Sequence, residues 1–234
     1  MRNYHSPPYV GGFMKFNKKL TILIWVLSFT WALPTTLVGC VVALYLRLRG
    51  NKPKRFGPIF YFPITEDYGL NLGPFILVPK NTDFYLNAHE LGHHLQACFR
   101  YGPFTVFVVA IPSVIRFWLR EQKTYDGKLL YTCLLAIAIY IVSAVLSWIG
   151  YFTKIVALAF IGLLLTIYGI IIQIWLNRFE VPRYKDGNYP SYDDAWFEGD
   201  ATKKGNDFMR KYFNEEVKRF WENIIMICQI MIMF

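Results

Sequence analysis

The fold class is decided by two apolar runs, LLYTCLLAIAIYIVSAVLSWI at Leu129–Ile149 and IVALAFIGLLLTIYGIIIQIWL at Ile155–Leu176. Each is close to the roughly 20 residues that a helix needs to cross the hydrocarbon of a bilayer. Only Gly150–Lys154 separates them. The stretch 129–176 therefore predicts a transmembrane helical hairpin with a tight turn.

The composition of the whole chain agrees with a membrane protein. Of its 234 residues, 55% are hydrophobic, and Lys and Arg outnumber Asp and Glu by 25 to 16. Such a positive surplus suits either nucleic acid or anionic lipid headgroups. Because the chain has long apolar runs, we expect membrane lipids and no nucleic acid as partners. The four cysteines contain no C-x-x-C pair, which indicates neither a disulfide framework nor a thiolate metal site.

The rest of the chain divides around further apolar segments. A basic N-terminal segment, 1–19, precedes the charge-free run Leu20–Leu46, which predicts a first transmembrane helix in the manner of an uncleaved signal anchor. Phe104–Ile115 is apolar but short, as in re-entrant or interfacial segments. We thus expect a mainly α membrane protein with about three transmembrane helices, a loop domain at 47–128 and a C-terminal segment at 177–234 that ends in an apolar tail.

Positive charge predicts the side of the membrane on which the loops lie. Basic clusters follow the first apolar run, precede the hairpin and follow it, and short loops rich in Lys and Arg stay cytoplasmic. All three clusters therefore favour one side and a non-crossing Phe104–Ile115. The N-terminal segment, with Arg2, Lys15, Lys18 and Lys19, would then lie on the opposite side, against the same rule, so the absolute orientation stays open.

Two similar pieces precede the most polar part of the chain, GPIFYFP at Gly57–Pro63 and GPFILVP at Gly73–Pro79. Short β-prone runs bracketed by Gly and Pro predict strands, and the polar ITEDYGLN between them predicts the loop of a hairpin. The alternative is that both pieces are aromatic anchors at the membrane interface.

The polar stretch Asn87–Pro103, NAHELGHHLQACFRYGP, carries the candidate chemistry. A helix from Thr82 to Arg100, ended by Gly102-Pro103, would place His89 and His93 about 5 to 6 Å apart at Cβ, so that both imidazoles could share one metal ion.

The residues beside the two histidines differ in what they can do. Glu90 is turned by roughly 100° and could act on a water held by the ion, as the general base of an H-E-x-x-H metallopeptidase does. His94 is expected at the surface or as an outer partner of the site. The alternative is that the histidines are only hydrogen-bonded within a polar loop helix.

Catalytic zinc usually takes three protein ligands and one water, so the third ligand should come from another segment. At Trp196–Gly205, WFEGDATKKG, the chain resembles the gluzincin metallopeptidases, whose second motif is E-x-x-A-D or E-x-x-x-D. Glu198 and Ala201 fit this motif. Thr202 stands where the family has an aspartate that steadies the first histidine, and Asp200 or Asp194 could take over that role.

The chain is also similar to uncharacterised small membrane proteins of bacteria and phages that combine several short motifs. These motifs are N-x-G-P-F-I, H-E-x-G-H-x-x-Q, a following G-P and an apolar I-P-S, found here at Asn71–Ile76, His89–Gln96, Gly102-Pro103 and Ile111–Ser113. The two hairpin spans look like an insertion between the matching parts.

The resemblance implies a small zincin-like α+β site at the membrane surface. His89, His93 and Glu198 would bind Zn²⁺, Glu90 would activate the water, and the strand Gly73–Pro79 would align a peptide or protein substrate. We thus expect an integral membrane zinc metallopeptidase of a bacterial inner (plasma) membrane, with its site at the cytoplasmic face. The alternatives are a non-catalytic membrane anchor or interaction protein with a structural zinc site, and a basic phage membrane protein that perturbs the host envelope.

Overall fold

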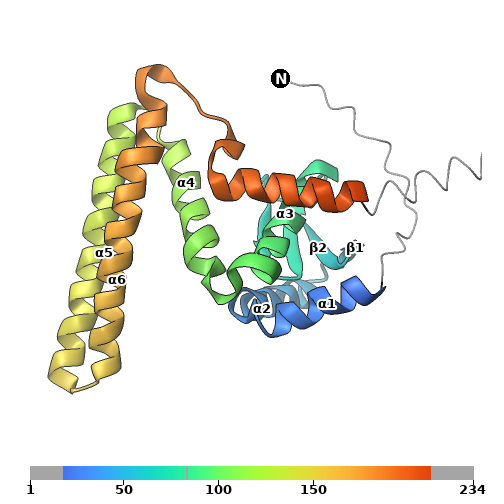
Figure 1. Cartoon of the computed structure of the whole chain (residues 1–234), viewed down its shortest axis with the longest axis horizontal. Helices are drawn as coiled ribbons and strands as arrows, with labels where there is room; N and C mark the ends of the chain where they lie inside the picture. The colour runs from blue at the N-terminus through green and yellow to red at the C-terminus, as the bar shows by residue number, and fades with distance from the viewer. Residues whose placement is uncertain (1–17, 83, 212–234) are drawn as a thin grey trace, which may run out of the picture. The chain divides into compact units, whose positions relative to one another are not determined.

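The computed structural model describes residues 18–82 and 84–211 and divides the chain into two compact units (Figure 1). The first unit combines residues 1–109 with residues 196–234, and the second unit, residues 110–195, is inserted between these parts. The described part of the first unit holds α1 (Lys18–Phe29), α2 (Leu33–Leu48), α3 (Phe84–Gln96), the helical turns Ala97–Tyr101, Gly102–Phe104 and Val106–Ala110, four strands and a helix at 196–211. The second unit holds α4 (Ile111–Glu121), α5 (Tyr125–Thr153), α6 (Val156–Trp175) and the helical turns Leu176–Glu180, Val181–Gly187 and Tyr192–Asp194.

The strands β1 (Lys54–Phe56), β2 (Ile59–Ile64), β3 (Leu70–Leu72) and β4 (Phe75–Pro79) form one sheet in the order β1-β2-β4-β3. β1 pairs antiparallel with β2, and β3 pairs antiparallel with β4. β2 and β4, which we expected to form one hairpin, instead pair in parallel.

The expected hairpin was wrong because each Gly-Pro pair serves as a turn onto the short strand before it. Gly57 and Gly73 have φ values of 60° and 67°, and two-residue hairpin turns need such a positive φ, which glycine adopts readily. The sheet thus contains two Gly-Pro hairpins joined side by side, and ITEDYGLN runs from the end of β2 into β3.

Leu20–Leu46, expected to be one transmembrane helix, forms two helices, α1 and α2, that are bent by 95° relative to each other. Pro34 lies in the first turn of α2, where its missing N–H costs no hydrogen bond. In a continuous helix the proline ring would clash with the carbonyl four residues earlier, so the first helix ends before it.

A hydrophobic core joins the parts of the first unit. It contains residues of α1, the sheet, α3 and the helix 196–211, namely Ile24, Phe56, Ile59, Tyr61, Ile76, Val78, Ala88, Leu91, Leu95, Cys98 and Met209. The chain therefore brings residues before and after the inserted unit into one core.

In the second unit, α5 and α6 lie side by side through small residues (Figure 1). The hydroxyl of Ser143 donates to the carbonyl of Gly162, and a Cβ on Gly162 would lie 2.2 Å from the Ser147 hydroxyl. Lys154, with φ 61°, forms the turn between the two helices. The expected helical hairpin with a tight turn is thus present.

A buried ion pair also holds the second unit together. Nε of Arg116 on α4 lies 2.6 Å from a carboxylate oxygen of Glu180, and both side chains are buried. The same guanidinium donates to the carbonyl of Ser191 at 2.8 Å. One buried cation therefore ties α4 to two later segments of the chain.

Two helices of the described chain, Tyr125–Thr153 and Val156–Gly187, are long and apolar enough to cross a membrane. The number rises to four if two bent pairs each count as one span, namely α1 with α2 and Phe84–Phe104 with Val106–Glu121. The second pair is bent between Phe104 and Val106, and the apolar segment Phe104–Ile115 is helical throughout. The apolar C-terminal tail lies outside the described residues.

Candidate metal centre

The helix α3 carries the H-E-x-x-H residues and is buried over nearly its whole length. All residues from Asn87 to Gln96 are buried. Beyond Gln96 the helix continues as a π-helical turn to Tyr101, and Gly102, with φ 54°, ends it as expected. The two histidines thus project from a fixed helix rather than from a loop.

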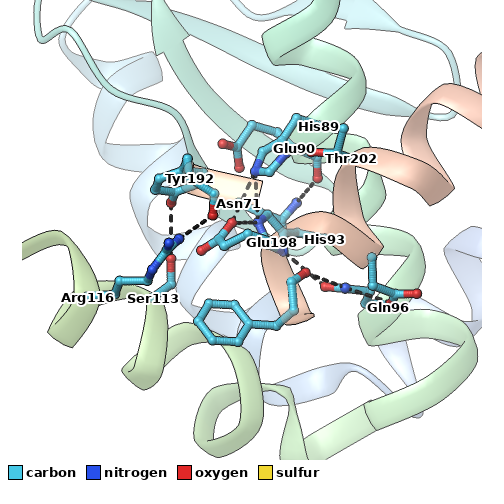
Figure 2. A network of polar contacts seen from close by, with 12 residues as sticks. Asn71, His89, Glu90, His93, Gln96, Ser113, Arg116, Tyr192, Glu198 and Thr202 are labelled. Carbon is cyan, nitrogen blue, oxygen red and sulfur yellow. Dashed lines mark hydrogen bonds and ion pairs between the residues drawn. The ribbon is translucent and has the colours of Figure 1, made fainter. Parts of the chain in front are cut away.

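Glu198 from the helix 196–211 meets both histidines. Its Oε2 lies 3.2 Å from Nε2 of His89 and 3.0 Å from Nε2 of His93, and the two nitrogens are 3.1 Å apart. The three side chains are 9%, 10% and 0% exposed. Figure 2 shows them pointing toward one another, and the group could hold a metal ion.

Two glycines allow the helices to approach closely enough for this contact. A Cβ on Gly92 of α3 would lie 1.9 Å from the carbonyl oxygen of Ala201, and a Cβ on Gly205 would lie 1.8 Å from that of Ala88. Each helix thus presents a glycine to the backbone of the other. This packing brings Glu198, on the turn before Ala201, beside the histidines.

The outer nitrogens of both histidines have polar partners. Nδ1 of His89 lies 2.7 Å from the hydroxyl of Thr202, and Nδ1 of His93 lies 3.0 Å from Oε1 of Gln96. The amide nitrogen of Gln96 donates to the Phe197 carbonyl at 2.7 Å and to Asp200 at 2.8 Å. Contacts of this kind fix the imidazole so that Nδ1 carries the proton and Nε2 faces an ion.

Neither Asp200 nor Asp194, the residues expected to replace the missing aspartate, takes its place beside His89. Thr202 itself contacts His89 through its hydroxyl, at the position where the gluzincin motif has an aspartate. Asp200 supports the other histidine through Gln96, and Asp194 belongs to the second unit. The spacing could have indicated Thr202, because it lies four residues after Glu198 on one helix.

Glu90 is buried beside the group but is not one of the three donors. A Cβ on Gly69 would lie 2.3 Å from its Oε1, so a glycine leaves room for the carboxylate. The side chain of Asn71 donates to the backbone carbonyl of Glu90 at 3.1 Å. Burial raises the pKa of Glu90, the charges of His93 and His89 oppose this, and Glu198 adds to it.

His94, which was expected either at the surface or as an outer partner of the site, is not at the surface. It is fully buried, and its Nε2 lies 3.1 Å from the hydroxyl of Ser28 on α1 and 3.6 Å from Sγ of Cys98. The residue therefore attaches α3 to α1 on the side of the helix away from the donors. The side chain of the neighbouring His93 points in a different direction, because successive residues of a helix are rotated by about 100°.

The strand Gly73–Pro79, which was expected to align a substrate, has no free edge. β4, at Phe75–Pro79, has β2 on one side and β3 on the other, so both of its edges are paired. Among the described residues, β3 pairs only with β4 and forms one of the two edges of the sheet, β1 being the other. Asn71 of β3 and the preceding Gly69 both lie against Glu90.

Comparison with models of known protein families, with curated proteins and with solved structures finds no match to this chain.

Proposed function

We propose that this protein is an integral membrane zinc metallopeptidase. The observation that carries the proposal is the triangle of His89, His93 and Glu198, with sides of 3.0 to 3.2 Å. Nitrogen and oxygen ligands at about 2.0 to 2.2 Å from a tetrahedral zinc ion lie about 3.3 to 3.6 Å from one another, slightly more than the sides of this triangle. Two imidazoles and one carboxylate are the ligand set of one class of catalytic zinc sites, which keep the fourth position for water.

The proposed reaction is hydrolysis of a peptide bond, with Glu90 as general base. Bound zinc would lower the pKa of a water and polarise the scissile carbonyl. Glu90 follows His89 on α3 and lies outside the donor group, so its carboxylate would take the proton of the attacking water.

The edge strand β3 would align the substrate in an extended conformation. An extended peptide can add to an exposed strand edge by main-chain hydrogen bonds. β3 is the edge next to Glu90, because Gly69 and Asn71 contact that residue. A peptide bond in a strand added to β3 would therefore run past the proposed base.

The site would lie at the cytoplasmic face of a bacterial plasma membrane. Glu198 touches His93 although the apolar helices α5 and α6 lie between them in sequence. The number of crossings between residues 93 and 198 must then be even. If both hairpin helices cross, Val106–Glu121 does not, and the basic loops on either side of the hairpin share the side that the positive-inside rule makes cytoplasmic.

The burial of the three donors favours a second candidate, a membrane anchor with a structural zinc site. All three side chains are at most 10% exposed. Such burial is common for the ligands of structural metal ions, which only hold segments of a chain together. Glu90 distinguishes the candidates because a structural ion needs no general base.

The test uses detergent-purified protein and the variants Glu90→Gln, Glu198→Gln and Glu66→Gln, the last on an exposed loop. We expect about one zinc per chain in the wild type, Glu90→Gln and Glu66→Gln, and a loss in Glu198→Gln, measured by elemental analysis. Cleavage of a mixed peptide library should be lost only in Glu90→Gln and Glu198→Gln. Zinc well below one equivalent in the wild type would exclude the metal site. Full zinc without any cleavage, with Glu90→Gln indistinguishable from the wild type, would leave the structural candidate.

A further inference from the structure

The outward faces of α1 and α2 are apolar and lack charge. On α1, Ile22, Val26 and Phe29 are between 45% and 62% exposed. On α2 the exposed residues follow a helical period along the full length of the helix, namely Leu37, Val41, Leu44 and Leu48 at 54% to 79%. No Asp, Glu, Lys or Arg occurs between Lys19 and Arg47. A continuous apolar surface of this kind marks contact with a membrane or another apolar partner.

The opposite faces of both helices are covered by the first unit itself. The indole of Trp25 donates to the carbonyl of Pro58 at 2.8 Å, and Ser28 contacts His94. On α2, a Cβ on Gly39 would lie 2.0 Å from the carbonyl oxygen of Leu72. In Figure 1 both helices lie on the same side of the sheet. The exposed apolar surface is therefore one side of a two-helix layer beneath the sheet.

The geometry of this layer opposes a membrane crossing. With 12 and 16 residues, α1 and α2 are about 18 and 24 Å long, each short of the roughly 30 Å of hydrocarbon. A crossing by the bent pair would also take the attached sheet into the bilayer, with the exposed charges of Lys54, Arg55 and Glu66. Open sheet edges and unpaired charges do not occur in contact with lipid tails.

We propose that α1 and α2 are embedded together in one leaflet of an anionic bilayer and do not cross it. Both ends of the pair would then lie at the same headgroup layer. The ends carry positive charge that complements anionic lipid, Lys18 and Lys19 at the start of α1, and Arg47 and Arg49 at the end of α2. This placement also removes the conflict in the charge pattern, because the basic N-terminal segment and the basic loops share one side.

Single cysteines and a membrane-impermeant maleimide test the sidedness. Lys18→Cys is at the start of α1 and Lys52→Cys lies after α2, and both positions are exposed. Thr153→Cys, at the exposed end of α5, reports the other end of the hairpin. The unsubstituted chain, with its native cysteines, gives the background. In sealed vesicles of known orientation, we expect positions 18 and 52 to label in the same preparation. Labelling of positions 18 and 52 in opposite preparations would overturn the proposal, whatever position 153 does.

Spin labels test whether lipid covers the apolar surface. Labels at Val41 and Leu48, in vesicles that contain phosphatidylglycerol, should be accessible to oxygen and lie at depths within one leaflet. Low oxygen accessibility at both positions would mean that a second copy or another protein covers this face, and the lipid assignment would be wrong. Neither measurement depends on zinc or peptide hydrolysis, so the proposed function can fail independently.

Discussion

A methyl group added at Gly92 should disrupt the metal centre without destroying the fold of the first unit. In Gly92→Ala the new Cβ would lie 1.9 Å from the carbonyl oxygen of Ala201, whereas such contacts are essentially never below 3.0 Å. The helix 196–211 must therefore move from α3 by about 1 Å. Metal–ligand distances tolerate only about 0.2 Å, so Glu198 would no longer complete the donor triangle.

Overpacking of this size costs about 1 to 3 kcal/mol of stability, which the hydrophobic core can absorb. We expect zinc affinity to fall at least tenfold, about 1.4 kcal/mol, measured by competition with a chromogenic chelator on detergent-purified protein. Gly205→Ala should act in the same direction because its Cβ would meet the Ala88 carbonyl at 1.8 Å. Lys203→Ala, on the exposed face of the same helix, is the control. Unchanged zinc affinity in a folded Gly92→Ala protein would refute the reasoning.

Three further outcomes follow from contacts around the site and in the second unit. Thr202→Val removes the hydroxyl beside His89 and should lower zinc affinity about 10- to 100-fold. Thr65→Val, in an exposed loop, is the control and should leave the affinity unchanged. Equal affinities in the two variants would contradict the role of Thr202. Burial lowers the pKa of His93, but the hydrogen bond and charge of Glu198 outweigh it and raise that pKa to about 9. Below that pH a metal ion must displace a proton from His93, so zinc affinity should rise with pH up to about 9. Titration calorimetry in two buffers should detect the released protons. An affinity independent of pH between about 6 and 8 would contradict this prediction. Arg116→Met leaves Glu180 without its main partner and should lower the free energy of unfolding by about 3 kcal/mol. Adding Glu180→Leu should recover much of this loss. Unfolding in a denaturing detergent measures both variants, and additive losses would contradict the pairing.

The sequence predicted well that His89 and His93 lie together on one helix, because helical spacing is a local property. His89 and His93 lie four residues apart on one helix, and this spacing alone predicts that their side chains are neighbours. The contact with Glu198 could be proposed only from a motif resemblance, because it joins residues 105 positions apart. The glycines that permit it, Gly92 and Gly205, fit equally well into a helix with no close neighbour.

The same limit explains the errors in the fold. A charge-free run with one proline was expected to form one continuous helix, and nothing in Leu20–Leu46 shows that one side of it packs against the sheet and α3. Whether a Gly-Pro turn connects a strand to the next one or to the one before depends on pairing partners such as Lys54–Phe56, which has only three residues. His94 was expected at the surface or as an outer partner of the site, and its contact with Ser28 could not be predicted because the two residues are 66 positions apart.

The division into two units bears on how the site would assemble. All three donors come from the first unit, so the inserted residues 110–195 contribute none of them. A metal ion shared by His93 and Glu198 would close a loop that contains this whole insertion. Closing a long loop costs conformational entropy that grows only slowly with its length, so the helical hairpin of α5 and α6 can occupy the loop at little additional cost. An ion that binds only the closed form would in turn favour it, and the docking of the helix 196–211 on α3 would be coupled to metal binding.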